Sequence, residues 1–88
     1  MKFTNHFLKR ISQRGIAIES ILKVFDLGSS YHCGSGCFAF IVPRKKCTRS
    51  EFRKLQSVVF IMNGSGVCIT AYHLAGKLPA HWTIAKVA

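Results

Sequence analysis

The sequence predicts an α+β domain in which two N-terminal helices cover one face of a small antiparallel sheet. Three observations indicate this class. Apolar residues recur at helical spacing over the first third of the chain, the spacing changes to that of strands after residue 28, and Asn63-Gly64-Ser65-Gly66 is a strong hairpin signal. With 88 residues, the chain is expected to form a single domain over positions 1–88.

The first helix is expected over residues 3–13. Apolar residues recur every four positions from Phe3 to Ile11, and Gly15 follows as a left-handed cap. A second stripe lies about 60° away around the same helix, given a turn of ~100° per residue. This basic stripe consists of His6, Arg10 and Arg14.

The second helix is expected over residues 16–27. Ile18, Ile21 and Phe25 supply its apolar face, and Gly28 follows as its stop. Because the connection between the two helices is very short, they are predicted to form an αα-hairpin with both apolar stripes on a common surface.

Two β-hairpins are expected to build the sheet. The first pairs residues 31–33 with 37–42, and the second pairs 57–62 with 67–74. Between them, Thr48-Arg-Ser-Glu51 has the spacing of a capping box, and a short helix there competes with an irregular basic loop. The last ten residues carry too little pattern for an assignment.

The chain has far more positive than negative charge. Thirteen Lys/Arg against three Asp/Glu give a formal net charge of +10 on a chain that is 49% hydrophobic. Most of this field must point outward, toward nucleic acid, an acidic protein or an anionic membrane surface. Three scattered acids disfavour paired-carboxylate hydrolysis and carboxylate-bound magnesium.

The sequence has no segment that is typical of a membrane span or a secretory signal. The apolar runs are much shorter than the roughly 20 residues that cross a bilayer. The first fourteen residues are basic and amphipathic, like a transit peptide, yet they lack a secretory core and a cleavage site. We expect them to belong to the fold of a cytoplasmic protein with no membrane partner.

Four cysteines, at 33, 37, 47 and 68, could form two disulfides, but a reducing compartment favours free thiols. The segment from His32 to Cys37 has Cys-x₃-Cys spacing, whereas zinc ribbons use Cys-x₂-Cys. We therefore predict no metal and no cofactor, and a small structural zinc protein stays as an alternative.

Clustered cations that follow a phosphate backbone are typical of nucleic-acid binders, although any single cluster can be just a solvated face. Beyond the basic stripe, cations gather after the central strand and in the segment that follows. The residues predicted to bind nucleic acid there are Arg44, Lys45, Lys46, Arg49 and Arg53.

RNA cleavage without metal needs a base for the 2′-hydroxyl, an acid for the leaving oxygen, and cations for the phosphate. His6 is a natural proton-transfer group near neutral pH, and Arg10 and Arg14 can hold phosphate oxygens. In the closing strand, regular alternation would place Cys68, Thr70 and Tyr72 on one face. His73, on the other face, would reach RNA only from a frayed or bulged strand end, or would lie outside the Tyr72 site.

These residues resemble a known pattern. His6-x₃-Arg10-x₃-Arg14-Gly15-Ile16 and the strand Ile69-Thr70-Ala71-Tyr72-His73 look like a family of small uncharacterised domains grouped with the RelE/ParE toxin superfamily. The resemblance covers roughly residues 3–74. It implies two helices on a curved antiparallel sheet, a toxin or ribonuclease-like role in a bacterial toxin–antitoxin pair or a related system, and an acidic antitoxin as partner. The positions that match the family's polar signature are His6, Arg10, Arg14, Thr70 and Tyr72.

The chain departs from the family at two places. Ala17 stands where such sequences often have a helix-capping Ser or Thr, and the basic segment 43–56 is longer than a simple hairpin. Members of the superfamily also differ in activity, since some are ribosome-dependent ribonucleases and others poison gyrase without cutting RNA. A shared fold therefore does not decide the mechanism.

The sequence thus favours a metal-independent endoribonuclease toxin that cleaves RNA, either free or as mRNA on the ribosome. Its expected catalytic residues are His6, Arg10, Arg14 and Tyr72, and Thr70 and His73 are expected to contact the nucleic acid. The main alternative is a non-enzymatic, basic nucleic-acid-binding or inhibitor protein, for example one that resembles a gyrase poison.

Overall fold

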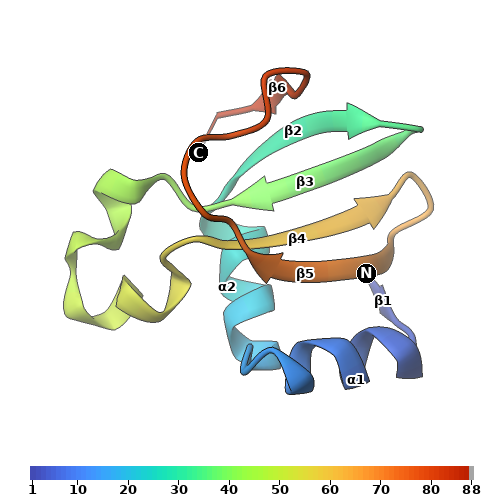
Figure 1. The fold of residues 1–88 in the computed structure, drawn as a ribbon, viewed down its shortest axis with the longest axis horizontal. Coiled ribbons are helices and arrows are strands. Elements are labelled where there is room, and N and C mark those ends of the chain that lie inside the picture. The colour runs from blue at the N-terminus through green and yellow to red at the C-terminus, as the bar shows by residue number, and fades with distance from the viewer. Residues whose placement is uncertain (88) are drawn as a thin grey trace.

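The structure is a computed structural model that describes residues 1–87, and it combines two α-helices with a six-stranded sheet (Figure 1). The order of the strands in the sheet is β1-β5-β4-β3-β2-β6. Only β1 and β5 pair in parallel among these neighbours. In chain order, the elements are β1 (Lys2–Phe3), α1 (Asn5–Gln13), α2 (Ile18–Leu27), β2 (Ser29–Gly34), β3 (Cys37–Ile41), the 3₁₀ helices η1 (Arg44–Thr48) and η2 (Ser50–Leu55), β4 (Val58–Asn63), β5 (Val67–His73) and β6 (Thr83–Lys86).

The α+β class is confirmed, but the sheet is larger than the predicted one. The two hairpins β2–β3 and β4–β5 form its centre, as the sequence predicts. β1 and β6 add a strand at each edge, and neither has a recognisable signal in the sequence. A two-residue strand and an exposed four-residue strand are too short to show the alternation that identifies a strand.

The start of α1 corrects the predicted range of 3–13. Thr4 is the N-cap, and its hydroxyl accepts a hydrogen bond from the Phe7 amide at 3.0 Å. Phe3 lies before this cap and pairs with Cys68 of β5. At the other end, Gly15 has φ +67, which confirms the left-handed cap.

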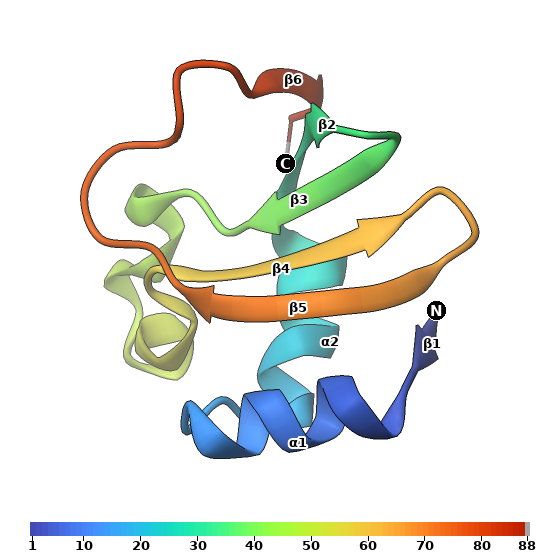
Figure 2. The ribbon, with the colours of Figure 1, turned by 45° about the vertical axis from the view of Figure 1, so that its right-hand side comes forward.

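The second helix begins at Ile18 rather than at residue 16. Its N-cap, Ala17, makes no side-chain hydrogen bond, as expected where a capping Ser or Thr is missing. In Figures 1 and 2, α1 runs along β5 while α2 stands at a steep angle to it behind the strands. The short joint between them places both apolar stripes in one core.

The core lies between the helices and the sheet. Phe7 of α1, Ile21 of α2 and Phe60 of β4 are each fully buried in it. Phe40 and Phe60 stack with ring centroids 4.7 Å apart, and Phe25 of α2 lies 5.3 Å from Phe40. Aromatic packing therefore joins α2 to the middle of the sheet.

The segment between the hairpins is helical, but not through the predicted capping box. The N-cap of η2 is Arg49, which makes no side-chain cap bond, and the Thr48 hydroxyl donates to the Lys45 carbonyl at 3.3 Å. Cys47 and Leu55 are buried, and they anchor this basic segment to the core.

The β4–β5 turn forms as predicted. The side-chain oxygen of Asn63 accepts hydrogen bonds from the Ser65 amide at 2.9 Å and from the Val67 amide at 3.0 Å. Gly66 takes φ +84, a conformation that glycine adopts without strain. The turn fixes where β5 begins.

A bulge interrupts β5 and corrects the regular alternation expected for it. Ile61 pairs with Thr70, but the next residue, Met62, pairs with Cys68, so Ile69 is extra. Cys68 and Ala71 both lie in the helix-side core as a result. Thr70 and Tyr72 still share a face, but Cys68 does not share it with them.

The C-terminal segment crosses to the far edge of the sheet. After β5, residues 74–82 lead to β6, which pairs with β2 (Figures 1 and 2). The Trp82 ring packs 6.2 Å from that of Tyr31 in β2. Within residues 1–87, no helix has the length and apolar character that crossing a membrane requires.

The packing of Phe60 makes a testable prediction. Replacing Phe60 with Ala should lower the free energy of unfolding by about 3–5 kcal/mol, because a fully buried ring would leave a cavity under Phe25 and Phe40. Urea unfolding measures this loss. Ile69→Ala is the matched control, since Ile69 is 44% exposed, and an equal loss in both variants would contradict the described core.

Candidate functional site

The basic stripe of α1 lies along β5, at the edge of the sheet. β1 pairs with β5 only at Val67 and Cys68, and in the described part of the chain no strand covers that edge further along. Arg14, at the C-terminal end of α1, contacts the uncovered part of this edge. Its Nη1 donates to the Ala71 carbonyl at 2.6 Å and to the Thr70 hydroxyl at 3.2 Å.

Arg14 therefore has a structural task that the sequence does not reveal. One guanidinium nitrogen satisfies a strand carbonyl that would otherwise lack a partner from a neighbouring strand. The same nitrogen holds Thr70, which faces away from the helices. Arg14 links α1 to β5 at the end of the basic stripe.

His6 and Arg10 form a second pair on the stripe. Arg10 Nε donates to His6 Nε2 at 3.4 Å, which requires that Nε2 carries no proton. Both side chains are exposed, and they line a shallow hollow of about 230 Å³ with Lys9 and Gln13. Because this contact uses the only free lone pair of a neutral imidazole, His6 can accept a proton at Nε2 only when Arg10 turns away.

The four predicted catalytic residues do not come together at one point. His6 and Arg10 contact each other, and Arg14 contacts Thr70. Along α1, His6 lies about 12 Å from Arg14 at 1.5 Å per residue. Tyr72 lies beyond Thr70 on β5, so it stands at the opposite end of the edge from His6.

Tyr72 sits on the sheet face that points away from α2. It pairs with Val59, which in turn pairs with Ile41, so these three side chains form one row across the strands. Partial burial raises the pKa of the Tyr72 hydroxyl, and the nearby Cys33 thiol raises it further. Tyr72 therefore keeps its proton at neutral pH, so its hydroxyl can donate or accept a hydrogen bond but cannot act as a base.

His73 lies on the other face. It borders a hollow of about 340 Å³ with Ile16, Lys54 and Val58, and its Nδ1 is 3.3 Å from the Ser57 hydroxyl. Of the two alternatives for His73, the structure favours a position outside the Tyr72 site. Its bond to Ser57 holds the imidazole beside the joint between α1 and α2.

The predicted nucleic-acid-binding cations lie at the end of the sheet where β3 ends and β4 begins (Figure 1). Lys45, Lys46 and Arg49 line one hollow there, next to Leu27 of α2. Arg44 instead lines a different cavity, on the side of Tyr31. The residues of this group, all with exposed side chains, are Arg44, Lys45, Lys46, Arg49 and Arg53.

The cavity that Arg44 lines was not predicted from the sequence. It has a volume of about 200 Å³ and lies between the strands and the segment that crosses from β5 to β6. We name it the crossover cavity. The residues that define it are Tyr31, Ile41, Arg44, Gln56, Leu74 and Leu78.

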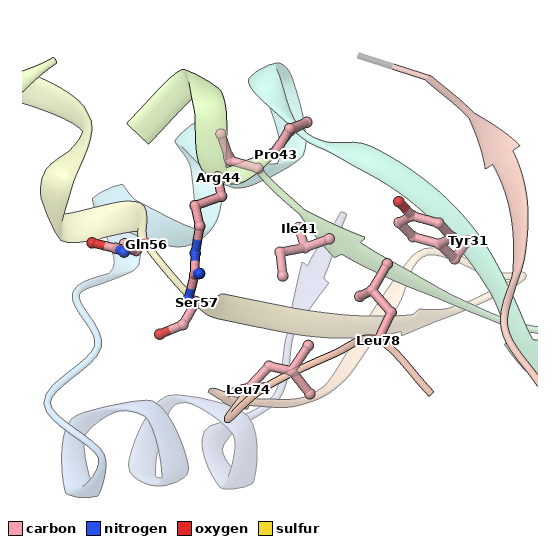
Figure 3. Close-up of a pocket in the computed structure, with 10 residues that line it drawn as sticks. Tyr31, Ile41, Pro43, Arg44, Gln56, Ser57, Leu74 and Leu78 are labelled. Carbon is pink, nitrogen blue, oxygen red and sulfur yellow. The ribbon is translucent and has the colours of Figure 1, made fainter. Parts of the chain in front are cut away.

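The arrangement of the crossover cavity is visible in Figure 3. Arg44, Gln56 and Ser57 lie together on one side, and Tyr31 and Leu78 lie on the other. These residues come from four parts of the chain that no local pattern connects. Only the nearby cations gave a signal for this region.

The four cysteines are free thiols in the structure. Burial raises the pKa of the Cys47 and Cys68 thiols, and burial together with the charge of Cys37 raises that of Cys33. Among residues 1–87, no group of three or more His, Cys, Asp or Glu side chains is placed to hold a metal ion.

Comparisons of the chain with protein-family models, curated proteins and solved structures gave no significant match. The resemblance to the RelE/ParE superfamily therefore stays a prediction from the two motifs.

The role of Arg14 makes a testable prediction. Arg14→Ala should lower the free energy of unfolding by about 1 kcal/mol, because it leaves the Ala71 carbonyl without its charged donor at a solvent-accessible edge. Thermal unfolding measures the change. Arg10→Ala, which removes only an exposed contact with His6, is the control, and equal stability of the two variants would argue against the link.

Proposed function

We propose that the protein is a metal-independent endoribonuclease of the toxin type, which cleaves single-stranded RNA at the edge formed by α1 and β5. The observation that carries the proposal is the contact between Arg10 and His6, 3.4 Å apart, on an exposed edge of a strongly basic chain. In the proposed reaction, Arg10 turns from His6 to the phosphate of the bound RNA, and this frees Nε2 of His6 to accept a proton from the same nucleotide.

Each residue has a defined part in the proposed reaction. His6 takes the proton of the 2′-hydroxyl, whose oxygen attacks the adjacent phosphorus and displaces the 5′-oxygen of the next nucleotide. Arg10 holds the charged phosphate oxygens, and Arg14 supports Thr70 at the strand edge. The leaving 5′-oxygen takes a proton from water, so the products are a 2′,3′-cyclic phosphate and a free 5′-hydroxyl.

Tyr72 supplies a second polar group. Its raised pKa keeps the hydroxyl protonated, so it can donate a hydrogen bond to the RNA, although the same shift makes it a weaker acid. Because it stands at the far end of the edge from His6, it would serve a neighbouring nucleotide unless the RNA or the α1 side chains move. The proposal also includes an acidic antitoxin as partner, since a chain with a formal net charge of +10 attracts acidic proteins as well as RNA.

A non-enzymatic RNA-binding protein is the second candidate. The separation of His6 from Tyr72 favours it, since a catalytic acid and base usually converge on one phosphate. In that case no single residue is indispensable, and Lys/Arg substitutions act additively through salt-dependent binding.

The test is cleavage of RNA by the purified protein in EDTA, with a translating extract assayed in parallel in case ribosomes must present the substrate. Wild type should yield 2′,3′-cyclic phosphate ends. His6→Ala should lower the rate by about 10²–10⁴-fold, the usual contribution of a proton-transfer group.

His81→Ala is the matched control, because it removes an exposed imidazole outside α1 and should leave the rate unchanged. Binding of a non-cleavable RNA should be nearly the same for both variants. Intact RNA in both assays, or full activity of the His6 variant, would contradict the enzymatic proposal.

A further inference from the structure

The crossover cavity has the size of a small ligand group rather than of a whole ligand. Its volume of about 200 Å³ is below the roughly 300–1,000 Å³ of sites that enclose drug-sized molecules. It suits one planar ring system, with the rest of the ligand outside. Its walls are mostly apolar, with the side chains of Ile41, Leu74 and Leu78 and the ring of Tyr31.

The polar groups of the cavity are concentrated on one side. The Gln56 amide offers both a donor and an acceptor, which is what the edge of a nucleobase presents to a protein. Arg44 extends toward Gln56 and Ser57 in Figure 3, and its planar guanidinium can hold a phosphate or stack on a base.

The position of the cavity connects it to the proposed site. Ile41 lies in the same row across the sheet as Val59 and Tyr72. Ile41 and Tyr72 are two strands apart, about 10 Å at ~4.8 Å per strand. A single RNA strand that passes Tyr72 can therefore reach the cavity.

We propose that the crossover cavity binds one unstacked base of the single-stranded RNA, with the phosphate of that nucleotide on Arg44. The proposal rests on the proposed function, because it assumes that RNA is the anionic partner. It adds a specificity subsite, since Gln56 would distinguish base edges while the apolar walls accept any ring.

Trp82 does not line the cavity, but it packs against Tyr31 of the cavity wall and can report on binding there. It is the only tryptophan of the chain, and its ring lies 6.2 Å from that of Tyr31. Each of the four ribonucleoside 5′-monophosphates is titrated against Trp82 fluorescence, with ribose 5-phosphate and inorganic phosphate as probes without a base. Saturable quenching by nucleotides alone supports the proposal, and equal responses to all probes overturn it.

Two adjacent cations give a matched pair of variants. Arg44 lines the crossover cavity, whereas Lys45 lines the hollow beside Leu27. Arg44→Gln and Lys45→Gln each remove one exposed positive charge, so general electrostatic binding should weaken alike. Only Arg44→Gln should weaken the nucleotide response, by about tenfold, the loss of one charged contact.

A larger side chain that fills the cavity tests whether the cavity recognises a base in RNA. The measurement is the binding of labelled A, U, C and G octamers, followed by fluorescence anisotropy. Leu78→Trp should bind about tenfold more weakly, the loss of one stacked base, and should no longer distinguish the octamers. Leu22→Trp on α2 is the control, because Leu22 is 44% exposed and lies outside the cavity.

The outcomes separate the two proposals. If wild type binds RNA but Leu78→Trp and Leu22→Trp behave as wild type does, the cavity proposal fails and RNA binding stands. If wild type binds no octamer, the proposed function itself fails. Displacement of a bound octamer from the cavity by an acidic peptide, with no response to nucleotides, would overturn the base site in favour of a peptide site.

Discussion

The architecture depends on how the free edge of β5 is closed. A strand with an open edge exposes carbonyl and amide groups that must find partners. β1 provides them at Val67 and Cys68, and Arg14 provides one at Ala71. These contacts hold α1 parallel to the strand, at the side of the sheet rather than over its centre (Figure 2). The basic stripe is therefore kept beside β5, where its first residues face solvent.

The bulge at Ile69 makes one face of β5 apolar and the other polar. By adding one residue, it lets Cys68 and Ala71 both enter the helix-side core, while Thr70 and Tyr72 point to the opposite face. A regular strand would have sent Cys68 to the same side as Tyr72. The bulge thus places polar chemistry on one side of β5 without weakening the core on the other, a common use of bulges near functional sites.

Local patterns predicted the local elements well. The helix stripes, the cap at Gly15 and the turn from Asn63 to Gly66 each depend on residues close in sequence, and each formed. β1, β6 and the crossover cavity depend on contacts between distant segments, which no periodicity encodes. The same limit applies to the site. Composition and spacing selected the candidate residues, but the bond from Arg14 to Ala71 and the contact of His73 with Ser57 follow from the tertiary structure.

The central claim is that RNA lies along one continuous path, from His6 over the β5 edge to the crossover cavity. Amide chemical shifts of ¹⁵N-labelled protein, titrated with a short 2′-deoxy-substituted RNA that cannot be cleaved, test this claim most directly. The structure predicts that the largest changes fall at Arg10, Thr70, Tyr72 and Leu78, and that the exposed α2 residue Leu22 does not respond. Changes centred on α2, or spread evenly over all cations, would contradict it.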